Sequence, residues 1–201
     1  MRKVCGVGIN DADYVVSKYE SWYEGGKRKL KILWQCPYYV KWRSMLNRCY
    51  SARYHKNKPT YIGCYVCEEW LTFSNFKAWM ETQDWERKEL GKDLLVEGNK
   101  EYGPNFCVFI SRELNLFLTD RKNFRGSWPI GVHFHKPSQK FISQLRHGGT
   151  QINLGSYDTP EEAHAIWKEG KLRLTVELAA KESDARIKLA LLSQYRDGGC
   201  E

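Results

Sequence analysis

The segment between residues 130 and 168 constrains the fold more than any other part of the chain. It contains IGVHFH, KFISQLR and QINLG, and in each of these stretches apolar residues alternate with polar ones. A period of two is typical of strands that bury one face. The loops between the stretches are short, and one of them reads His-Gly-Gly-Thr. The pattern therefore predicts a three-stranded antiparallel sheet.

A helix is expected directly after this sheet. In TPEEAHAIWKEGK, Thr159 is placed as the N-cap, Pro160 as the first helical residue and Glu162 as the side chain that closes a capping box. The residues expected to pack on the apolar face of the sheet are Ala163, Ile166 and Trp167. The fold class that follows is α+β, with a three-stranded antiparallel sheet packed on a helix.

The opposite face of the predicted sheet is polar and contains no acidic residue. Its side chains are those of His133, His135, Lys140, Gln144, Arg146, Gln151 and Asn153. Amides and guanidinium groups match the edges of base pairs, and a sheet of this kind can enter the major groove of DNA. An ordinary solvated face is the alternative, but the lack of Asp and Glu favours DNA. The net charge of +8 and the isoelectric point near 9.1 agree with a polyanionic partner.

The first half of the chain has a different character, with aromatic residues at helical spacing. A basic, poorly periodic lead-in covers residues 1–35, and its GGKRKLK run at 25–31 is expected to be an exposed loop. A helix is predicted over residues 38–50, followed by a polar loop, SARYHKNKPTY. A second aromatic stripe leads to a helix through Met80, capped by Ser74 or Thr72, and we expect the stripe to be core. Its residues are Trp70, Phe73, Phe76, Trp79 and Met80.

Residues 90–120 predict a strand–strand–helix unit. DLLV and CVFI are the strand candidates, and SRELNLFL is the helix, which starts at Ser111. The breaker-rich run RKNFRGSWP then marks a domain boundary. The expected organisation is a lead-in at 1–35, a first module at 36–122, the sheet module at 127–170 and C-terminal helices at 171–201, broken near Ser183.

The chain has seven cysteines and no sign of a disulfide framework. Cys64 and Cys67 are separated by two residues, a spacing that lets both thiolates reach one zinc ion. The further candidates for a tetrahedral zinc site are Cys36, Cys49 and Cys107. The alternative is that these cysteines are small apolar core residues.

The sheet module resembles the Apetala-type (ethylene-response-factor) DNA-binding domain. The resemblance rests on GVHFHKPSQKFISQLRHGGTQINLGSYDTPEEAHAIWK, which covers nearly the whole sheet-and-helix unit. It implies that the sheet binds double-stranded DNA. Arg125, just before the module, is added to the expected DNA contacts.

The first module resembles the HNH homing endonucleases of tailed bacteriophages over about residues 36–120. The matching phrases are RCYS, VCEEW, FSNFKAWM and GNKEYGP, with Cys107 after them. The resemblance implies that Asp93 and Asn115 are ligands of a magnesium or manganese ion, and that Asn105 orients the loop between them. Oxygen donors suit these metals.

The position of the family's histidine base is occupied by Leu94 in this chain. Leucine cannot accept a proton, and loss of a general base costs about 10²–10⁴-fold in rate. Three alternatives follow: His55 could replace the base, the metal alone could activate water and leave a slow nuclease or nickase, or cleavage could be lost.

Taken together, these features predict a phage-type DNA-binding protein, expected to be a metal-dependent HNH endonuclease or nickase acting on duplex DNA. The alternatives are a catalytically degenerate DNA binder or regulator, and an inhibitor that binds another protein. No apolar run approaches the ~18 residues of a membrane span. No signal peptide is recognisable at the N-terminus. We therefore expect no membrane partner and a location in the cytoplasm of an infected bacterial host.

Overall fold

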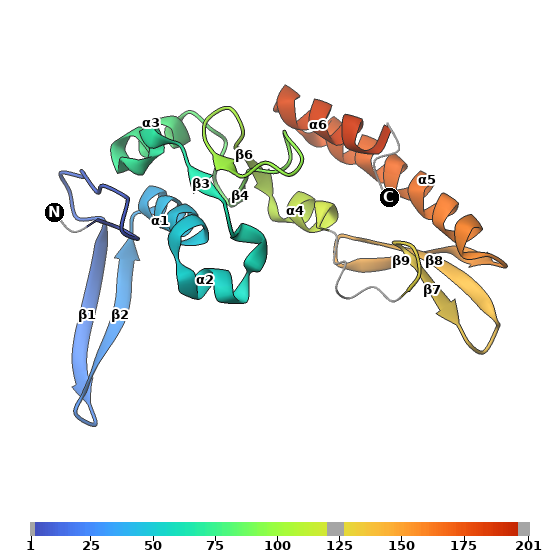
Figure 1. Ribbon diagram of the computed structural model, residues 1–201, viewed down its shortest axis with the longest axis horizontal. Helices are drawn as coiled ribbons and strands as arrows, with labels where there is room; N and C mark the ends of the chain where they lie inside the picture. The colour runs from blue at the N-terminus through green and yellow to red at the C-terminus, as the bar shows by residue number, and fades with distance from the viewer. Residues whose placement is uncertain (1–2, 120–126, 197–201) are drawn as a thin grey trace. The chain divides into compact units, whose positions relative to one another are not determined.

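The structure is a computed structural model that describes residues 3–119 and 127–196 (Figure 1). It divides into two compact units, Met1–Phe109 and Ile110–Glu201. Both units combine helices and strands, so the α+β fold class is confirmed. Among the helices of the described residues, none has the length and apolar character needed to cross a bilayer.

The lead-in is an integral part of the first unit. Ile9 forms a parallel bridge to Thr72, and the Ile9 amide donates to the carbonyl oxygen of Leu71 at 2.8 Å. Val7 and Val16 pack on the core of the unit. Residues 3–16 are therefore fixed by the rest of the unit, although they form only isolated β-bridges and no helix or strand.

The basic run at 25–31 is not a loop. Strands β1 (Ser17–Glu24) and β2 (Lys27–Gln35) form an antiparallel hairpin whose turn is Gly25-Gly26. Both glycines have positive φ, +56° and +71°, as a tight two-residue hairpin turn requires. The prediction of exposure is confirmed, but the prediction of a loop is wrong, because the charged residues of the run alternate with Leu30 and Ile32 in a strand.

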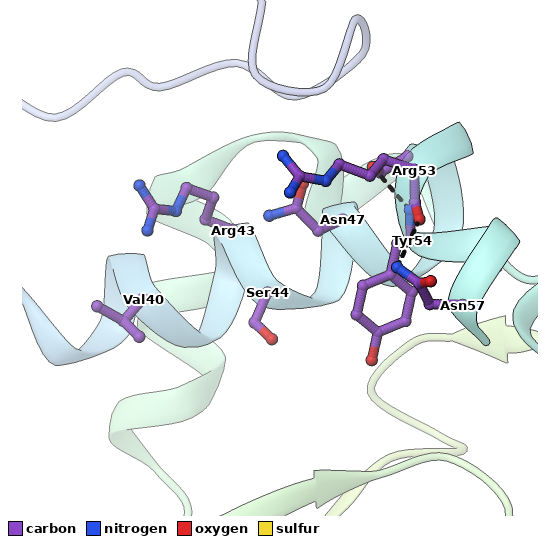
Figure 2. Close-up of a pocket in the computed structure, with 8 residues that line it drawn as sticks. Val40, Arg43, Ser44, Asn47, Arg53, Tyr54 and Asn57 are labelled. Atoms are coloured by element: carbon purple, nitrogen blue, oxygen red, sulfur yellow. Dashed lines mark hydrogen bonds between the residues drawn. The ribbon is translucent and has the colours of Figure 1, made fainter.

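Helix α1 (Pro37–Tyr50) is the predicted amphipathic helix, and it buries Trp42, Met45, Leu46 and Cys49. The expected polar loop after it is instead helix α2 (Ala52–Asn57) and a 3₁₀ turn (Pro59–Tyr61). Ser51 caps α2, since its side chain accepts from the Tyr54 amide at 3.3 Å. The polar sides of α1 and α2 line one hollow (Figure 2).

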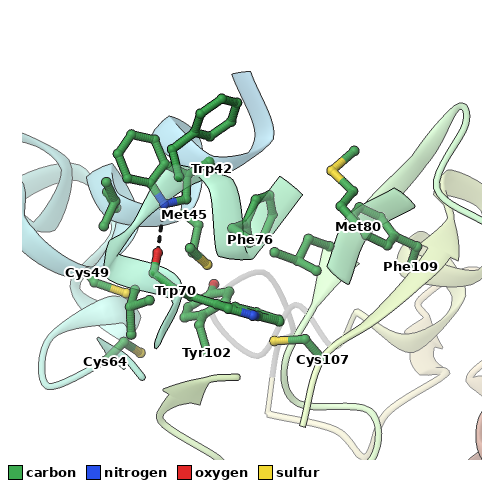
Figure 3. Close-up of a cluster of buried hydrophobic side chains, with 14 of the residues drawn as sticks. Trp42, Met45, Cys49, Cys64, Trp70, Phe76, Met80, Tyr102, Cys107 and Phe109 are labelled. Carbon is green, nitrogen blue, oxygen red and sulfur yellow. Dashed lines mark hydrogen bonds between the residues drawn. The ribbon is translucent and has the colours of Figure 1, made fainter. Parts of the chain in front are cut away.

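The aromatic stripe forms the core of the first unit (Figure 3). A 3₁₀ turn (Glu68–Leu71) leads into helix α3 (Phe73–Glu81), which buries Phe73, Phe76 and Met80. The Trp42 indole donates to the carbonyl oxygen of Trp70 at 2.7 Å, which ties α1 to this turn. The aromatic residues of the stripe are thus core residues, as expected from their spacing. Thr72 occupies the N-cap position, but its side chain makes no capping bond.

Four short strands complete the region before the second unit. β3 (Tyr65–Val66) pairs in parallel with β5 (Glu101–Tyr102), and β4 (Lys88–Gly91) pairs with β6 (Val108–Ser111). The predicted strand at CVFI is confirmed. The one at DLLV is wrong, because the strand lies earlier, at KELG, and DLLV itself is a bend.

Helix α4 (Arg112–Leu118) begins at the predicted residue, with the Ser111 hydroxyl accepting from the Leu114 amide at 3.0 Å. It groups with the second unit, since the unit boundary lies after Phe109. Lys171 explains this grouping: its ammonium donates to the carbonyl oxygen of Phe117 and lies 3.4 Å from the centre of the Phe117 ring. The boundary predicted at 121–129 falls largely on residues outside those described.

The second unit contains the predicted three-stranded sheet, in the order β7 (Val132–His135), β8 (Lys140–His147), β9 (Thr150–Tyr157). Both pairs are antiparallel. A register shift in the second pair leaves Leu154 as an extra residue on β9.

Helix α5 (Pro160–Lys181) starts with the predicted capping box between Thr159 and Glu162. It continues beyond residue 170 to Lys181, and the break predicted near Ser183 is confirmed, since residues 182–184 separate α5 from α6 (Ala185–Arg196). Ala163 and Trp167 are buried as predicted, whereas Ile166 is only half-buried.

Candidate nucleic-acid interface

The register of the sheet assigns its strand residues to two faces. Leu145 pairs with Ile152 and Ser143 with Gly155, and Leu145 and Ser143 are buried. A Cβ on Gly170 of α5 would lie 3.0 Å from Leu154 and 3.7 Å from Leu145, so α5 covers this side. The other side is turned away from the helix. We call it the outer face.

The outer face carries the side chains that the sequence predicted. Its cross-strand pairs are His133 with Ile142, His135 with Lys140, Gln144 with Asn153, Arg146 with Gln151 and Ile142 with Ser156. Arg146, Gln151, Asn153 and His135 are exposed. The three strands, which are described in full, contain no Asp or Glu.

Hydrogen bonds fix several side chains on the outer face, among them His135, whose Nδ1 lies 2.8 Å from Ser138 Oγ, and Asn153, whose Oδ1 accepts from the Gly155 amide at 2.9 Å. Gln144 Nε2 hydrogen-bonds to His133 Nδ1, and because the amide nitrogen can only donate, Nδ1 is the accepting ring nitrogen. Lys140 donates to Asp158 at 2.8 Å, at the end of β9 where the chain turns toward α5. Asp158 thus lies beside the first residue of β8, whereas Arg146 lies near the last. The carboxylate is therefore at the opposite end of the strand from the guanidinium group. The pairing leaves amide, imidazole and guanidinium groups in a row that can donate to base edges or phosphates.

The predicted catalytic acid, Asp93, lies in the first unit. Its side chain is 61% exposed, and the buried ammonium of Lys92 donates to it. Lys92 also donates to the carbonyl oxygen of Asn99, whose amide returns a bond to the Lys92 carbonyl at 2.9 Å. Leu94 follows in the bend, so the chain itself supplies no base at that position. An ammonium bound to Asp93 competes with a metal ion for the same carboxylate.

Tyr61 lies near Asp93, and Arg48 lies over the Tyr61 ring, 5.9 Å from its centre. Arg48 donates to the carbonyl oxygen of Leu90 at 3.2 Å, and Tyr102 and Tyr61 hold the pKa of Arg48 above its usual value although burial opposes the charge. Burial raises the pKa of Tyr61, and Asp93 adds to this effect while Arg48 opposes it. Tyr61 therefore lies close enough to Asp93 for the two side chains to interact electrostatically.

His55, the candidate replacement base, is bound at one ring nitrogen. Its Nε2 lies 2.8 Å from the carbonyl oxygen of Arg48. A carbonyl can only accept, so Nε2 donates and Nδ1 is the nitrogen able to take a proton in the neutral ring. His55 is half-buried on α2.

The two predicted asparagines are exposed, and they belong to different units. Asn105 lies in the turn before β6 in the first unit, and Asn115 lies on α4 in the second. The backbone carbonyl of Asn115 accepts from the Thr119 hydroxyl at 2.7 Å. Asp93 and Asn115, the two expected magnesium ligands, are therefore on separate units.

The candidate zinc ligands are free thiols in the first unit. Burial raises the pKa of Cys49 to about 12, with a further contribution from Cys64, and burial likewise raises the pKa of Cys107 to about 12, with Cys67 nearby. Cys36 contacts the Tyr14 hydroxyl at 3.6 Å. Within residues 3–119 and 127–196, no three His, Cys, Asp or Glu side chains converge as a metal site requires. The zinc and magnesium sites stay predictions.

The structure adds a basic hollow that the sequence analysis missed. It measures about 440 Å³, lies between α1 and α2, and contains two arginines and no carboxylate (Figure 2). Its lining residues are Val40, Arg43, Ser44, Asn47, Ser51, Arg53, Tyr54 and Asn57. The sequence could have indicated the α1 side of this hollow, because residues 40, 43, 44 and 47 recur at helical spacing on the face opposite the buried residues of α1. Guanidinium and amide groups in such a hollow can hold a phosphate.

The remaining predicted DNA contact, Arg125, lies outside the described residues. Comparison of the chain with protein-family models, with curated proteins and with solved structures gave no match.

Proposed function

We propose that this protein binds double-stranded DNA through the outer face of its three-stranded sheet. The observation that carries the proposal is the register of β8 with β9, which puts Arg146, Gln151 and Asn153 side by side on an exposed surface whose strands have no acidic residue. The chain's net charge of +8 gives the electrostatic attraction that brings such a surface to DNA.

The architecture of the second unit suits this role. Helix α5 covers the opposite side of the sheet, and Trp167 and Leu145 are buried between them. The strands are thus held rigidly while their outer side chains stay accessible. Arg146 is the side chain with the donor geometry for guanine, and the amides of Gln151 and Gln144 match adenine. Phosphate contacts then fix the position of the sheet along the duplex.

The test compares Arg146→Ala with Arg173→Ala, a matched loss of one exposed arginine on α5. Duplexes that bind the native protein are first selected from a randomised pool. We expect Arg146→Ala to weaken binding to the selected site by about 1–3 kcal/mol and to relax the preference at one base pair. Arg173→Ala is expected to change little. Equal affinities and preferences for both variants, or no binding of any duplex at low salt, would overturn the proposal.

A second candidate function is hydrolysis of DNA by the first unit. The observation that favours it is the exposed Asp93 carboxylate beside the Lys92 ammonium and near Tyr61, a cationic and a hydroxyl group that a scissile phosphate could use. A divalent ion bound through Asp93 would supply charge stabilisation at the phosphate. The chain's own residues would position the DNA strand at the ion. We expect cleavage to be slow because Leu94 provides no base.

Supercoiled plasmid, incubated with magnesium or manganese, tests this candidate. Nicking by the native protein that disappears in Asp93→Ala but persists in Asp84→Ala, a carboxylate of the same unit that pairs with Lys88 at 2.7 Å, supports it. Retardation of the plasmid without any nicking leaves the DNA-binding function and removes the hydrolytic one.

A further inference from the structure

The hairpin of β1 and β2, which we call the ribbon, is the most exposed element of the first unit. Every residue from Lys18 to Trp34 is exposed. Tyr23 is 75% exposed, Leu30 60% and Ile32 53%, values that are high for large apolar side chains. A two-stranded hairpin alone is only marginally stable in water, so an apolar surface of this kind indicates a contact with another molecule.

The register separates the ribbon into two faces. One face carries Tyr19 opposite Ile32, Ser21 opposite Leu30 and Tyr23 opposite Arg28. The other face carries Glu20 opposite Lys31, Trp22 opposite Lys29 and Glu24 opposite Lys27. The first is apolar with an arginine at its tip, and the second is charged with Trp22 at its centre.

Positive charge is concentrated on one strand of the ribbon. β2 and the residues around its turn supply four cations within five positions: Lys27, Arg28, Lys29 and Lys31. The ribbon has two carboxylates, and one of them, Glu24, lies 3.8 Å from Lys29. The exposed ion pair is weak, so the cations stay available to a stronger polyanion.

The base of the ribbon lies close to Arg43, one of the residues that line the basic hollow. The Cys36 amide donates to the carbonyl oxygen of Val16 at 2.9 Å, and Gln35 donates to Ser17 at 3.2 Å. A hydrogen bond with Ser17 lowers the pKa of Tyr19 most, burial opposes the shift, and Gln35 and Arg43 lower the pKa further. Arg43, which lines the hollow, is thus close to Tyr19 at the base of the ribbon.

From this charge and shape we infer that the ribbon is a second DNA-binding element, which enters a groove of the same duplex that the sheet binds. The inference rests on the proposed function. A two-stranded ribbon has the width that the major groove accepts. Its cations reach phosphates, while Tyr23 and Leu30 lie against sugars or between base steps.

A second copy of the chain fits this surface less well than DNA. In a dimer, the apolar face of one ribbon would pack on the apolar face of a second ribbon. The assembly would then contain two ribbon tips, each with Lys27, Arg28 and Lys29. Like charges at close range oppose that arrangement, whereas phosphates neutralise them. Charge complementarity therefore favours the duplex.

The first test removes charge from the tip of the ribbon in the full-length protein. The triple variant Lys27→Gln, Arg28→Gln, Lys29→Gln is compared with Lys168→Gln, Arg173→Gln, Lys181→Gln, an identical loss on exposed positions of α5. The logarithm of the affinity for duplex DNA is measured against the logarithm of salt concentration. We expect the slope to fall by about 2–3 in the ribbon variant, because each phosphate contact contributes about 0.9, and to change little in the control. Equal slopes would overturn the inference.

The second test addresses the apolar face without changing charge. Tyr23→Ser with Leu30→Ser is expected to reduce the affinity for duplex DNA at least fivefold and to leave the salt slope unchanged. Leu189→Ser, at a 69% exposed position of α6, serves as the control. Circular dichroism confirms that each variant is folded. Unchanged affinity, or tighter binding to single strands than to duplex, contradicts the inference.

The outcomes separate this inference from the function on which it rests. If the native protein binds no duplex, the proposed function fails and the ribbon has no DNA to contact. If the protein binds DNA and both ribbon variants behave as their controls, only the ribbon inference fails. Light scattering without DNA gives the third outcome, since a stable dimer that Tyr23→Ser with Leu30→Ser dissociates would assign the face to a second copy.

Discussion

Asp11 and Thr159 show two ways in which a residue caps a helix in this protein. Thr159 caps α5 from the adjacent position, within a local capping box. Asp11 does the same for α3 from 63 residues earlier in the chain, since its carboxylate accepts from the Ser74 amide at 2.9 Å and from the Ser74 hydroxyl at 2.6 Å. Both contacts satisfy amide groups that the first turn of a helix leaves without a partner.

Removal of the Asp11 carboxylate is predicted to destabilise the first unit in a pH-dependent way. Burial acts to raise the pKa of Asp11, but the hydrogen bonds from Ser74 outweigh it and the pKa is lowered. A lowered pKa means that the stabilisation is present above the unfolded pKa of about 3.9 and is lost as the pH falls through the folded pKa. Asp11→Ala should cost about 0.5–2 kcal/mol at pH 7.

Chemical denaturation of the native and variant proteins at several pH values measures this effect. The difference in unfolding free energy should shrink as the pH falls below about 4, where Asp11 is protonated in the unfolded chain first, and should be smallest below the lowered pKa of the native carboxyl. Asp13→Ala, a change of the neighbouring exposed carboxylate, is the control. A difference that persists unchanged at pH 2–3 contradicts a capping role for the charge.

At the residue scale, the side-chain contacts that could be predicted from the sequence are those between residues close together in the chain. Thr159, Pro160 and Glu162 lie within four positions, so their roles could be predicted from spacing alone. The cap from Asp11 could not be predicted, because it depends on the bridge between Ile9 and Thr72 that brings the lead-in to α3. The same applies to Lys92, whose partner Asn99 approaches only when the chain between them bends.

At the scale of elements, the contact between Gly131 and Trp167 fixes the position of α5 on the sheet. Gly131 has a φ of +80°, and a Cβ at this position would lie 1.9–2.4 Å from atoms of the Trp167 ring. The ring of His164 stacks on Trp167, with centroids 5.5 Å apart, and His164 Nδ1 lies 2.9 Å from the carbonyl oxygen of Ile130. Helix α5 thus packs on the start of the sheet through the Trp167 indole, and only a glycine at position 131 leaves room for this ring.

Gly131→Ala is therefore predicted to destabilise the second unit by about 2–4 kcal/mol, through backbone strain together with displacement of Trp167. The matched control is Gly148→Ala, which also has a positive φ, +58°, but whose Cβ would meet nothing within 4 Å. The control should cost about 1 kcal/mol. Equal losses of unfolding free energy for the two variants would show that Trp167 does not depend on this glycine.

The elements that could be predicted were those with one buried face. The strands β8 and β9 alternate apolar and polar residues because α5 covers one side, and α1 and α3 show the helical period for the same reason. The ribbon is exposed on both faces, so burial imposes no pattern on its charges, and its run GGKRKLK at 25–31 was predicted to be a loop. The strand at KELG was missed because Leu90 is its only buried residue, so no apolar alternation marks it in the sequence.

At the scale of the whole molecule, the two surfaces proposed to bind DNA belong to different units. The outer face of the sheet belongs to the second unit, whereas the ribbon belongs to the first. Two surfaces linked in one chain raise the effective concentration of each at the duplex, so overall affinity can exceed that of either one. The outer face was predictable from strand periodicity, but the hollow needed the packing of α2 on α1.

Binding of duplex DNA by the outer face can be tested by an amide and side-chain NMR titration of the full-length protein with duplex DNA at low salt. We expect the largest shift changes at Gln144, Arg146, Gln151 and Asn153, and little change at Lys168 and Arg173 on α5. Shift changes confined to α5 and α6, or a spectrum that duplex DNA leaves unchanged, would contradict this expectation.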